Sequence, residues 1–216
     1  MIPAAVLNLK QWYLTLPIGK KGSPKLVKQP ELDTFEDESY FFVAGDSVVF
    51  KAPCDGVTTD NSNYPRSELR EMVGDKLAAW SVAEGVHTLT FKGAVQTLPS
   101  HKPEVVIGQI HDDKDDVIEI LCSKNIIKVV HDGTVYGVLD PKYILGAVYT
   151  ITITASKGLI TVDYNGLPMV KLKNKSSKAN NYFKVGCYTQ SNPSKGDGHG
   201  EYGEVWVSSV TVTHEK

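Results

Sequence analysis

Apolar and polar residues alternate along most of the chain, and this period of two predicts β-strands. The segments concerned are rich in β-branched and aromatic residues, which favour pleated sheets. The clearest of them are residues 40–50, 126–130, 148–154, 159–164 and 204–213. Many short strands, without a long segment of helical periodicity, predict an all-β sandwich or barrel.

Turn-forming pairs separate the predicted strands, namely Asp132-Gly133, Asp140-Pro141, Lys157-Gly158 and Asn165-Gly166. The Asn-Gly pair follows the run 148–164 and precedes the run 167–172, so we expect a meander of hairpins there. Residues 3–10 and 76–84 are the two segments where a short helix is expected.

Length and charge restrict the organisation of the chain. Its 216 residues suit a single domain over residues 1–216, because neither an internal repeat nor a linker interrupts the pattern. The 23 Lys and Arg residues nearly balance 25 Asp and Glu residues. No basic run or recognition motif points to nucleic acid, and no apolar run is long enough to span a membrane. An acidic ligand would therefore need a local basic patch.

Cysteine usage leaves two readings open. Cys54, Cys122 and Cys187 allow at most one disulfide and a free thiol, or three buried thiols.

The first of three unusually polar strands is predicted at residues 66–72. Alternation places Arg66, Glu68 and Arg70 on one face of that strand. The opposite face carries Ser67, Leu69 and Glu71. Two arginines around a glutamate present planar donors that suit carboxylates. A solvated edge strand with ion pairs would show the same pattern.

The second polar strand is predicted at residues 105–111. Gln109 and His111 share one face, and the other face carries Val106, Gly108 and Ile110. An amide and an imidazole at a strand end form a donor-rich pair. A lone histidine with a local hydrogen bond is the commoner explanation of this pattern.

The third polar strand is predicted at residues 182–190. One face forms a core stripe of Phe183, Val185 and Cys187. The other face carries Tyr182, Lys184, Gly186, Tyr188 and Gln190. A half-buried strand with a polar outer face fits this pattern but does not explain the tyrosines and the glutamine.

Four sequence blocks resemble those of polysaccharide lyase family seven, the alginate lyases. They are WYLTLPIG at 12–19, YPRSELRE at 64–71, QIH at 109–111 and YFKVGCYTQ at 182–190. They occur in family order and cover essentially the whole chain. One departure is Val185-Gly186-Cys187, where the family more often has Ala-Gly followed by another residue than cysteine. Because Cys187 is expected to face the core, the departure should not affect the chemistry.

The resemblance implies a jelly-roll sandwich of two antiparallel sheets with a concave substrate groove. It implies cleavage of alginate, an anionic polymer of 1→4-linked uronates, by β-elimination at C5 and C4. The catalytic residues implied are Arg66, Gln109, His111 and Tyr188, where the first two neutralise the uronate carboxylate and the last two move protons. Substrate-binding positions implied are Glu68, Arg70, Lys184 and Gln190.

The resemblance also implies that the enzyme needs no metal or cofactor, acts as a secreted or extracellular monomer, and cleaves within the polymer. The isoleucine in QIH resembles family members that prefer guluronate. The segments 55–65 and 191–203 could close over the groove, and a loop that blocked one end of it would instead make the enzyme exolytic.

Other functions fit parts of the sequence. A glycoside hydrolase needs two facing carboxyl groups, and Asp115 and Glu119 are the nearest candidates. A non-catalytic polysaccharide-binding module would keep the cations without needing His111 and Tyr188. A lyase acting on another polyuronate, such as glucuronan, would keep all of these residues. The acidic stretch 112–116 could bind calcium, although a solvated loop is the better explanation.

Overall fold

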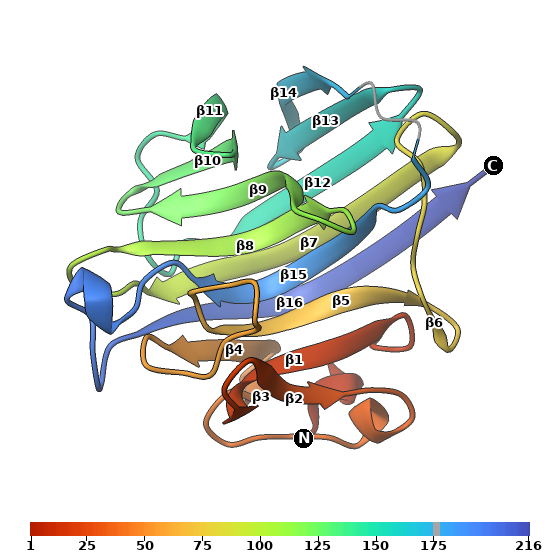
Figure 1. The fold of residues 1–216 in the computed structure, drawn as a ribbon. Coiled ribbons are helices and arrows are strands. Elements are labelled where there is room, and N and C mark those ends of the chain that lie inside the picture. The colour runs from red at the N-terminus through yellow and green to blue at the C-terminus, as the bar shows by residue number, and fades with distance from the viewer. Residues whose placement is uncertain (175–177) are drawn as a thin grey trace.

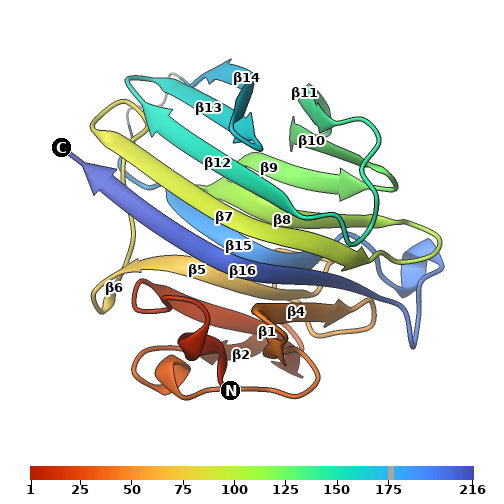
Figure 2. The same ribbon diagram turned by 180° about the vertical axis from the view of Figure 1, so that it is seen from behind.

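Two antiparallel β-sheets pack face to face and form almost the whole structure (Figures 1 and 2). The structure is a computed structural model, and it describes residues 1–174 and 178–216. The prediction of an all-β sandwich is confirmed. Within the described residues no helix is long and apolar enough to cross a membrane.

The first sheet contains the strands with the unusual polar residues, and β5, β15 and β8 lie near its centre (Figure 1). Its strands are, in spatial order, β11 (Thr134–Asp140), β10 (Ile126–His131), β9 (Asp116–Ser123), β8 (Glu104–His111), β15 (Tyr182–Thr189), β5 (Arg66–Val73), β1 (Trp12–Lys20) and β2 (Ser23–Val27). A short strand, β6 (Lys76–Leu77), pairs with β5 outside this order.

The second sheet closes the other side of the core (Figure 2). Its strands are, in spatial order, β14 (Leu167–Lys173), β13 (Leu159–Tyr164), β12 (Tyr149–Ser156), β7 (Val86–Thr97), β16 (Tyr202–Glu215), β4 (Ser47–Pro53) and β3 (Phe41–Ala44). Three 3-10 turns complete the described elements: η1 (Pro3–Ala5), η2 (Glu31–Asp33) and η3 (Pro193–Lys195).

Most predicted strands are found close to their expected limits, but two local predictions were wrong. The run 40–50 is divided into β3 and β4, because Gly45 adopts a φ of 62° and turns the chain. No helix forms at 76–84, where β6 is followed by a bridge between Trp80 and Asn181. The expected helix near the N-terminus is limited to η1.

The meander from β12 to β14 is confirmed. Asn165 and Gly166 have φ values of 51° and 80°, which matches the tight turn that Asn-Gly favours in hairpins. Lys157 and Gly158 form the preceding turn with φ values of 51° and 75°.

The inward faces of both sheets share one apolar core. Leu69, Phe91 and Phe183 are fully buried in it, as alternation predicted for β5 and β15. Cys54, Cys122 and Cys187 are buried free thiols, so the structure favours the second reading of the cysteines.

A carboxylate inside this core joins the two sheets. Glu71 of β5 is fully buried and accepts hydrogen bonds from the Trp80 indole (2.9 Å), the Phe183 backbone N–H (2.8 Å) and His214 Nε2 of β16 (2.5 Å). Both carboxyl oxygens of Glu71 therefore have hydrogen-bond partners. These hydrogen bonds to Glu71 hold β15 and β16 against β5 at one end of the sandwich.

A β-bulge changes the facing predicted for β8. Its register against β9 shifts between Val106 and Gly108, so one residue is unpaired there. Ile107 and Gly108 consequently face the core, while Val106 turns outward and packs with Leu121 and Val130. The prediction that Val106 shares the face of Ile110 was therefore wrong, whereas Gln109 and His111 keep their predicted face.

Gly186 in β15 also differs from its predicted orientation. It has a φ of 145°, and a Cβ there would lie 2.6 Å from the Ser67 carbonyl oxygen and 3.0 Å from the Phe50 ring. The glycine thus allows close approach of β5 and the core, and it does not open space for a ligand.

Replacing Gly186 with alanine should destabilise the protein by more than about 3 kcal/mol, because backbone strain adds to a clash with the backbone of β5. Urea unfolding measures this loss. Gly133→Ala is the matched control, since Gly133 has a φ of 72° but open space around it, and it should cost about 1–2 kcal/mol. Equal losses in the two variants would contradict the close approach at Gly186.

Candidate active site

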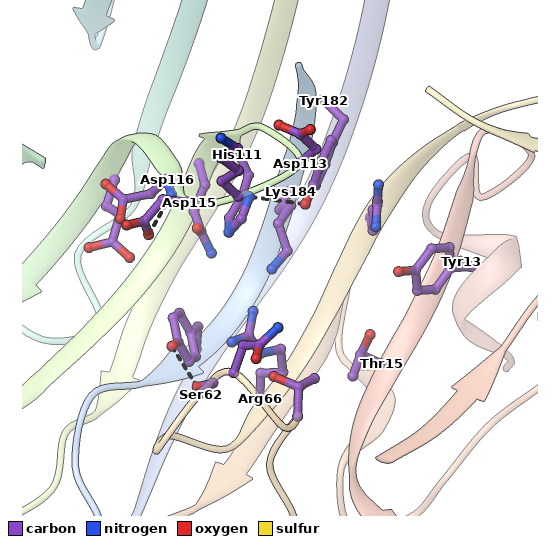
Figure 3. Close-up of a pocket in the computed structure, with 17 residues that line it drawn as sticks. Tyr13, Thr15, Ser62, Arg66, His111, Asp113, Asp115, Asp116, Tyr182 and Lys184 are labelled. Carbon is purple, nitrogen blue, oxygen red and sulfur yellow. Dashed lines mark hydrogen bonds between the residues drawn. The ribbon is translucent and has the colours of Figure 1, made fainter. Parts of the chain in front are cut away.

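The three polar strands are direct neighbours, in the order β8, β15, β5. Their register places Lys184 opposite both Gln109 and Arg70, and Tyr182 opposite His111. Side chains from these strands line a cleft of about 330 Å³ on the outer face of the first sheet (Figure 3). The cleft is also lined by Tyr13 and Thr15 of β1, residues 59, 61 and 62, and residues 113–116 and 119.

A buried carboxylate organises the floor of the cleft. Glu68 is 1% exposed and lies between two cations and an amide. Lys184 Nζ is 2.6 Å and Arg66 Nη1 is 3.1 Å from Glu68 Oε2, and Gln109 Nε2 donates to Glu68 Oε1 at 2.6 Å. Each of the three polar strands therefore supplies one partner or more to the same carboxyl group.

Burial and charge act in opposite directions on this cluster. Burial favours the neutral form of Glu68, but Lys184 and Arg66 outweigh it and lower the pKa of the carboxyl group. Burial lowers the pKa of Lys184 to about 8, and the charge of Arg66 acts in the same direction. Because the pair lies at 2.6 Å, both groups are charged at neutral pH.

Arginine side chains in the cleft keep donors available. The Arg70 guanidinium stacks on the Tyr182 ring, with Cζ 3.7 Å from the ring centroid. The buried Nε atoms of Arg66 and Arg70 have no hydrogen-bond partner within the described part of the chain. Since these Nε atoms are covered by protein, the donors that a carboxylate in the cleft can reach are the terminal guanidinium nitrogens.

His111 has a defined tautomer. Its Nδ1 lies 2.6 Å from the carbonyl oxygen of Asp112. Because a carbonyl oxygen only accepts hydrogen bonds, Nδ1 carries the hydrogen and Nε2 keeps its lone pair. Burial, together with the charge of Lys184, lowers the pKa of His111, so the ring is neutral at neutral pH. Tyr182 stacks against it at a centroid distance of 5.3 Å, and the Tyr182 hydroxyl oxygen, 3.0 Å from Nδ1, is a second acceptor for the same N–H.

Tyr188 is held between a cation and an apolar surface. The Arg66 guanidinium lies 3.7 Å from its ring centroid, and Val106, Leu121 and Val130 pack against the tyrosine. Its hydroxyl group is 2.8 Å from Ser62 Oγ. The outward turn of Val106 at the β-bulge thus positions a phenol in the cleft.

The cleft has an acidic side as well as a cationic one. Asp113, Asp115 and Asp116 line it from the loop before β9 and the start of that strand (Figure 3). Glu119 of β9 lines the same side. Burial, together with the charges of Asp116 and Glu68, raises the pKa of Glu119 to about 8. Among residues 1–174 and 178–216, no group of three or more His, Cys, Asp or Glu side chains is arranged to hold a metal ion.

Comparison with known proteins gives the family of this fold and cleft. The family model described as alginate lyase matches residues 7–214. The chain belongs to the alginate lyase family.

Solved structures agree with this assignment. This alginate lyase shares 45% identity with AlgAT5, an alginate lyase from polysaccharide lyase family 7, with a TM-score of 0.95 and 100% of both chains covered. An alginate lyase from Corynebacterium sp. shares 39% identity, with a TM-score of 0.92, over 99% of this chain and 98% of that one. A curated alginate lyase from Klebsiella pneumoniae is 27% identical, over 98% of this chain and 91% of its own length. The expected jelly-roll fold and polysaccharide lyase class are confirmed.

The structure places six of the predicted site residues of this alginate lyase in the cleft. They are Arg66, Arg70, Gln109, His111, Lys184 and Tyr188. The other two lie elsewhere. Glu68 is buried beneath the cleft, where it holds the cations in place. Gln190 follows the end of β15 and is not among the residues that line the cleft, and its amide nitrogen is buried without a partner among the described residues.

Several cleft residues had no specific signal in the sequence. Ser62 comes from an irregular loop, and its contact with Tyr188 depends on the fold. Tyr182 was placed on the correct face by alternation, but its stacking on Arg70 and His111 was not predicted. The loop 191–203 contacts the loop 55–65, since the Asn192 side chain donates to the Asn63 carbonyl oxygen at 2.9 Å. Residues 191–203 are not among those that line the cleft.

Glu68→Gln should destabilise this alginate lyase by about 3–5 kcal/mol, because Arg66 would keep a buried charge without a counter-ion and Lys184 would lose the carboxylate that opposes the lowering of its pKa. Urea unfolding at pH 7 measures the loss. Adding Lys184→Met should recover part of the stability, since it removes a buried amine that has lost its partner. Strictly additive losses in the double variant would contradict the ion pair.

Proposed function

We propose that this alginate lyase is endolytic and prefers polyguluronate. It cleaves internal bonds of the polysaccharide by β-elimination and releases oligosaccharides with a 4,5-unsaturated end. The proposal rests on one observation: two arginine side chains lie beside a neutral imidazole and a phenol in a single cleft. These groups supply the charge stabilisation and the two proton-transfer partners that elimination needs.

Charge neutralisation comes first in the proposed mechanism. The C5 proton of a uronate is weakly acidic because the adjacent carboxylate is already negative. Arg66 and Gln109 each use one N–H on Glu68 and have further N–H groups to donate to that carboxylate. Their fixed positions stabilise the dianionic intermediate formed when the proton leaves.

Proton transfer is assigned to His111 and Tyr188. In guluronate the C5 proton and the leaving oxygen lie on opposite sides of the sugar, so two groups are needed. His111 Nε2 has a free lone pair and takes the proton, and the Tyr188 hydroxyl group protonates the leaving O4. In mannuronate the two atoms lie on the same side, where Tyr188 serves both steps.

The remaining cations hold neighbouring sugars. Arg70 and Lys184 line the cleft and have the charge that uronate carboxylates require. Two structures of the alginate lyase A1-II′, with TM-scores of 0.84 and 0.85 to this chain, are complexes with a product, GGG, and with a substrate, GGMG. This similarity supports alginate oligosaccharides as ligands of the same cleft.

The arrangement of acidic residues argues against glycoside hydrolysis. Asp115 and Glu119 both come from β9 and the loop before it, on one side of the cleft. Hydrolysis requires carboxyl groups on both sides of the scissile bond.

We further propose that the enzyme acts as a monomer. We also propose that it acts outside the cell, since its substrate is a large polymer.

His111→Ala and Tyr188→Phe should each reduce turnover of polyguluronate at least about 100-fold, because each removes a proton-transfer partner. Ultraviolet absorbance of the unsaturated uronate measures turnover on polyguluronate, polymannuronate and glucuronan separately. His199→Ala and Tyr136→Phe are the matched controls at exposed positions and should retain turnover. Near-full turnover by Tyr188→Phe would disprove the assignment of the acid, and faster cleavage of another polymer would replace the proposed substrate.

The pH dependence should report the lowered pKa of His111. A base acts in its neutral form, so kcat/KM should fall on the acid side with an apparent pKa below 6.5. Steady-state rates between pH 4 and pH 8 measure this limb. An apparent pKa above 6.5 would show that the imidazole is not desolvated as the structure indicates.

A further inference from the structure

Glu119 occupies an unusual position in the cleft. Its neighbours in β9, Ile118 and Ile120, are buried in the core, so the Glu119 side chain points to the cleft. It lies opposite Gln109 on one side and Val130 on the other. Glu119 is half-buried. It lines the same cleft as Arg66 and Gln109, which bind the uronate carboxylate in the proposed mechanism.

The other carboxyl groups that line the cleft are bonded to the protein. Asp113 accepts from the Asn180 amide, Asp115 from the Asp116 backbone N–H, and Asp116 pairs with His131. Glu119 has no hydrogen bond or ion pair among the residues that the structure describes. Its polar atoms are therefore left for a ligand or for solvent.

The charges around Glu119 oppose its ionisation. Asp116, on its own strand, and Glu68, on β5, disfavour a negative charge there. Lys184 of β15 and Arg66 of β5 favour it, but both are already paired with Glu68. On β10, His131 is paired with Asp116, and on β8 the ring of His111 is neutral. Burial has the largest effect, and together with these charges it raises the pKa of Glu119, which favours the protonated carboxylic acid near neutral pH.

We propose that Glu119 binds the substrate as a neutral acid: its hydroxyl group donates a hydrogen bond to an oxygen of a uronate. Once ionised, the same side chain can only accept, and it repels the polyanion. The acidic side of the cleft would then hold the polymer weakly at high pH. This inference deepens the proposed function and rests on it, since the ligand is the same uronate polymer.

The protonation state can be tested without a ligand. The pKa of Glu119 is raised from 4.5 to about 8, so the folded protein keeps a proton that the unfolded chain releases in this range. The contribution of Glu119 to stability therefore falls as the pH rises from about 4.5 to 8. Glu119→Gln lacks this loss, and its melting temperature relative to wild type should rise by at least about 3 °C between pH 5 and pH 8. The exposed Glu36→Gln is the matched control and should show no such trend.

Binding tests the contact with substrate. Calorimetry with guluronate oligosaccharides, in a Tyr188→Phe background that slows cleavage at least about 100-fold, gives Kd with and without Glu119→Gln. The two Kd values should agree within about twofold at pH 6.5, and the protein with Glu119 should bind at least about fivefold more weakly at pH 9.5. Lys184 loses its charge in the same range, but it is present in both proteins, so the ratio of Kd values isolates Glu119.

The outcomes separate this inference from the proposed function. A constant ratio of Kd values, or a constant difference in melting temperature, would overturn the role of Glu119. Absence of elimination by the wild-type enzyme on all three polymers would instead overturn the proposed function.

Discussion

A carboxylate can be buried in a protein only when cations and hydrogen-bond donors surround it, and Glu68 satisfies this constraint with groups from three adjacent strands. The same bonds fix the positions of Arg66, Lys184 and Gln109. Flexible cationic side chains thereby become an ordered surface for an anion. The cleft depends on this contact, because without it the two cations would repel each other in a poorly solvated site.

Sequence patterns predicted the fold better than they predicted the contacts. Alternation gave the correct faces of β5 and of Gln109 and His111, because one side of each strand is buried. It failed at Val106, since an unpaired residue in β8 is visible only when the partner strand is known. The family resemblance placed Glu68 among the substrate-binding positions, and no pattern in one strand reveals that neighbouring strands bury its carboxyl group.

The cleft shows how local and total charge can differ. The chain has a net charge of −2, but Arg66, Arg70 and Lys184 gather on β5 and β15 while acidic residues gather near β9. A polymer of uronates therefore meets a field with a direction across the cleft. Such a field orients the carboxylates toward the arginines, and neither total composition nor one strand's sequence contains this information.

The position of β15 has a consequence for biosynthesis. This strand is late in the chain, yet it lies between β5 and β8, so Cys187 pairs with Ser67 far back in the sequence. While the ribosome is still translating the first 180 or so residues, β5 and β8 lack the neighbour that joins them. The nascent chain thus exposes two unpaired strand edges, and closure of this long-range pairing is expected to be slow. β16 is made later still and lies between β7 and β4 in the same way, so both sheets are completed only when the C-terminal strands have been synthesised.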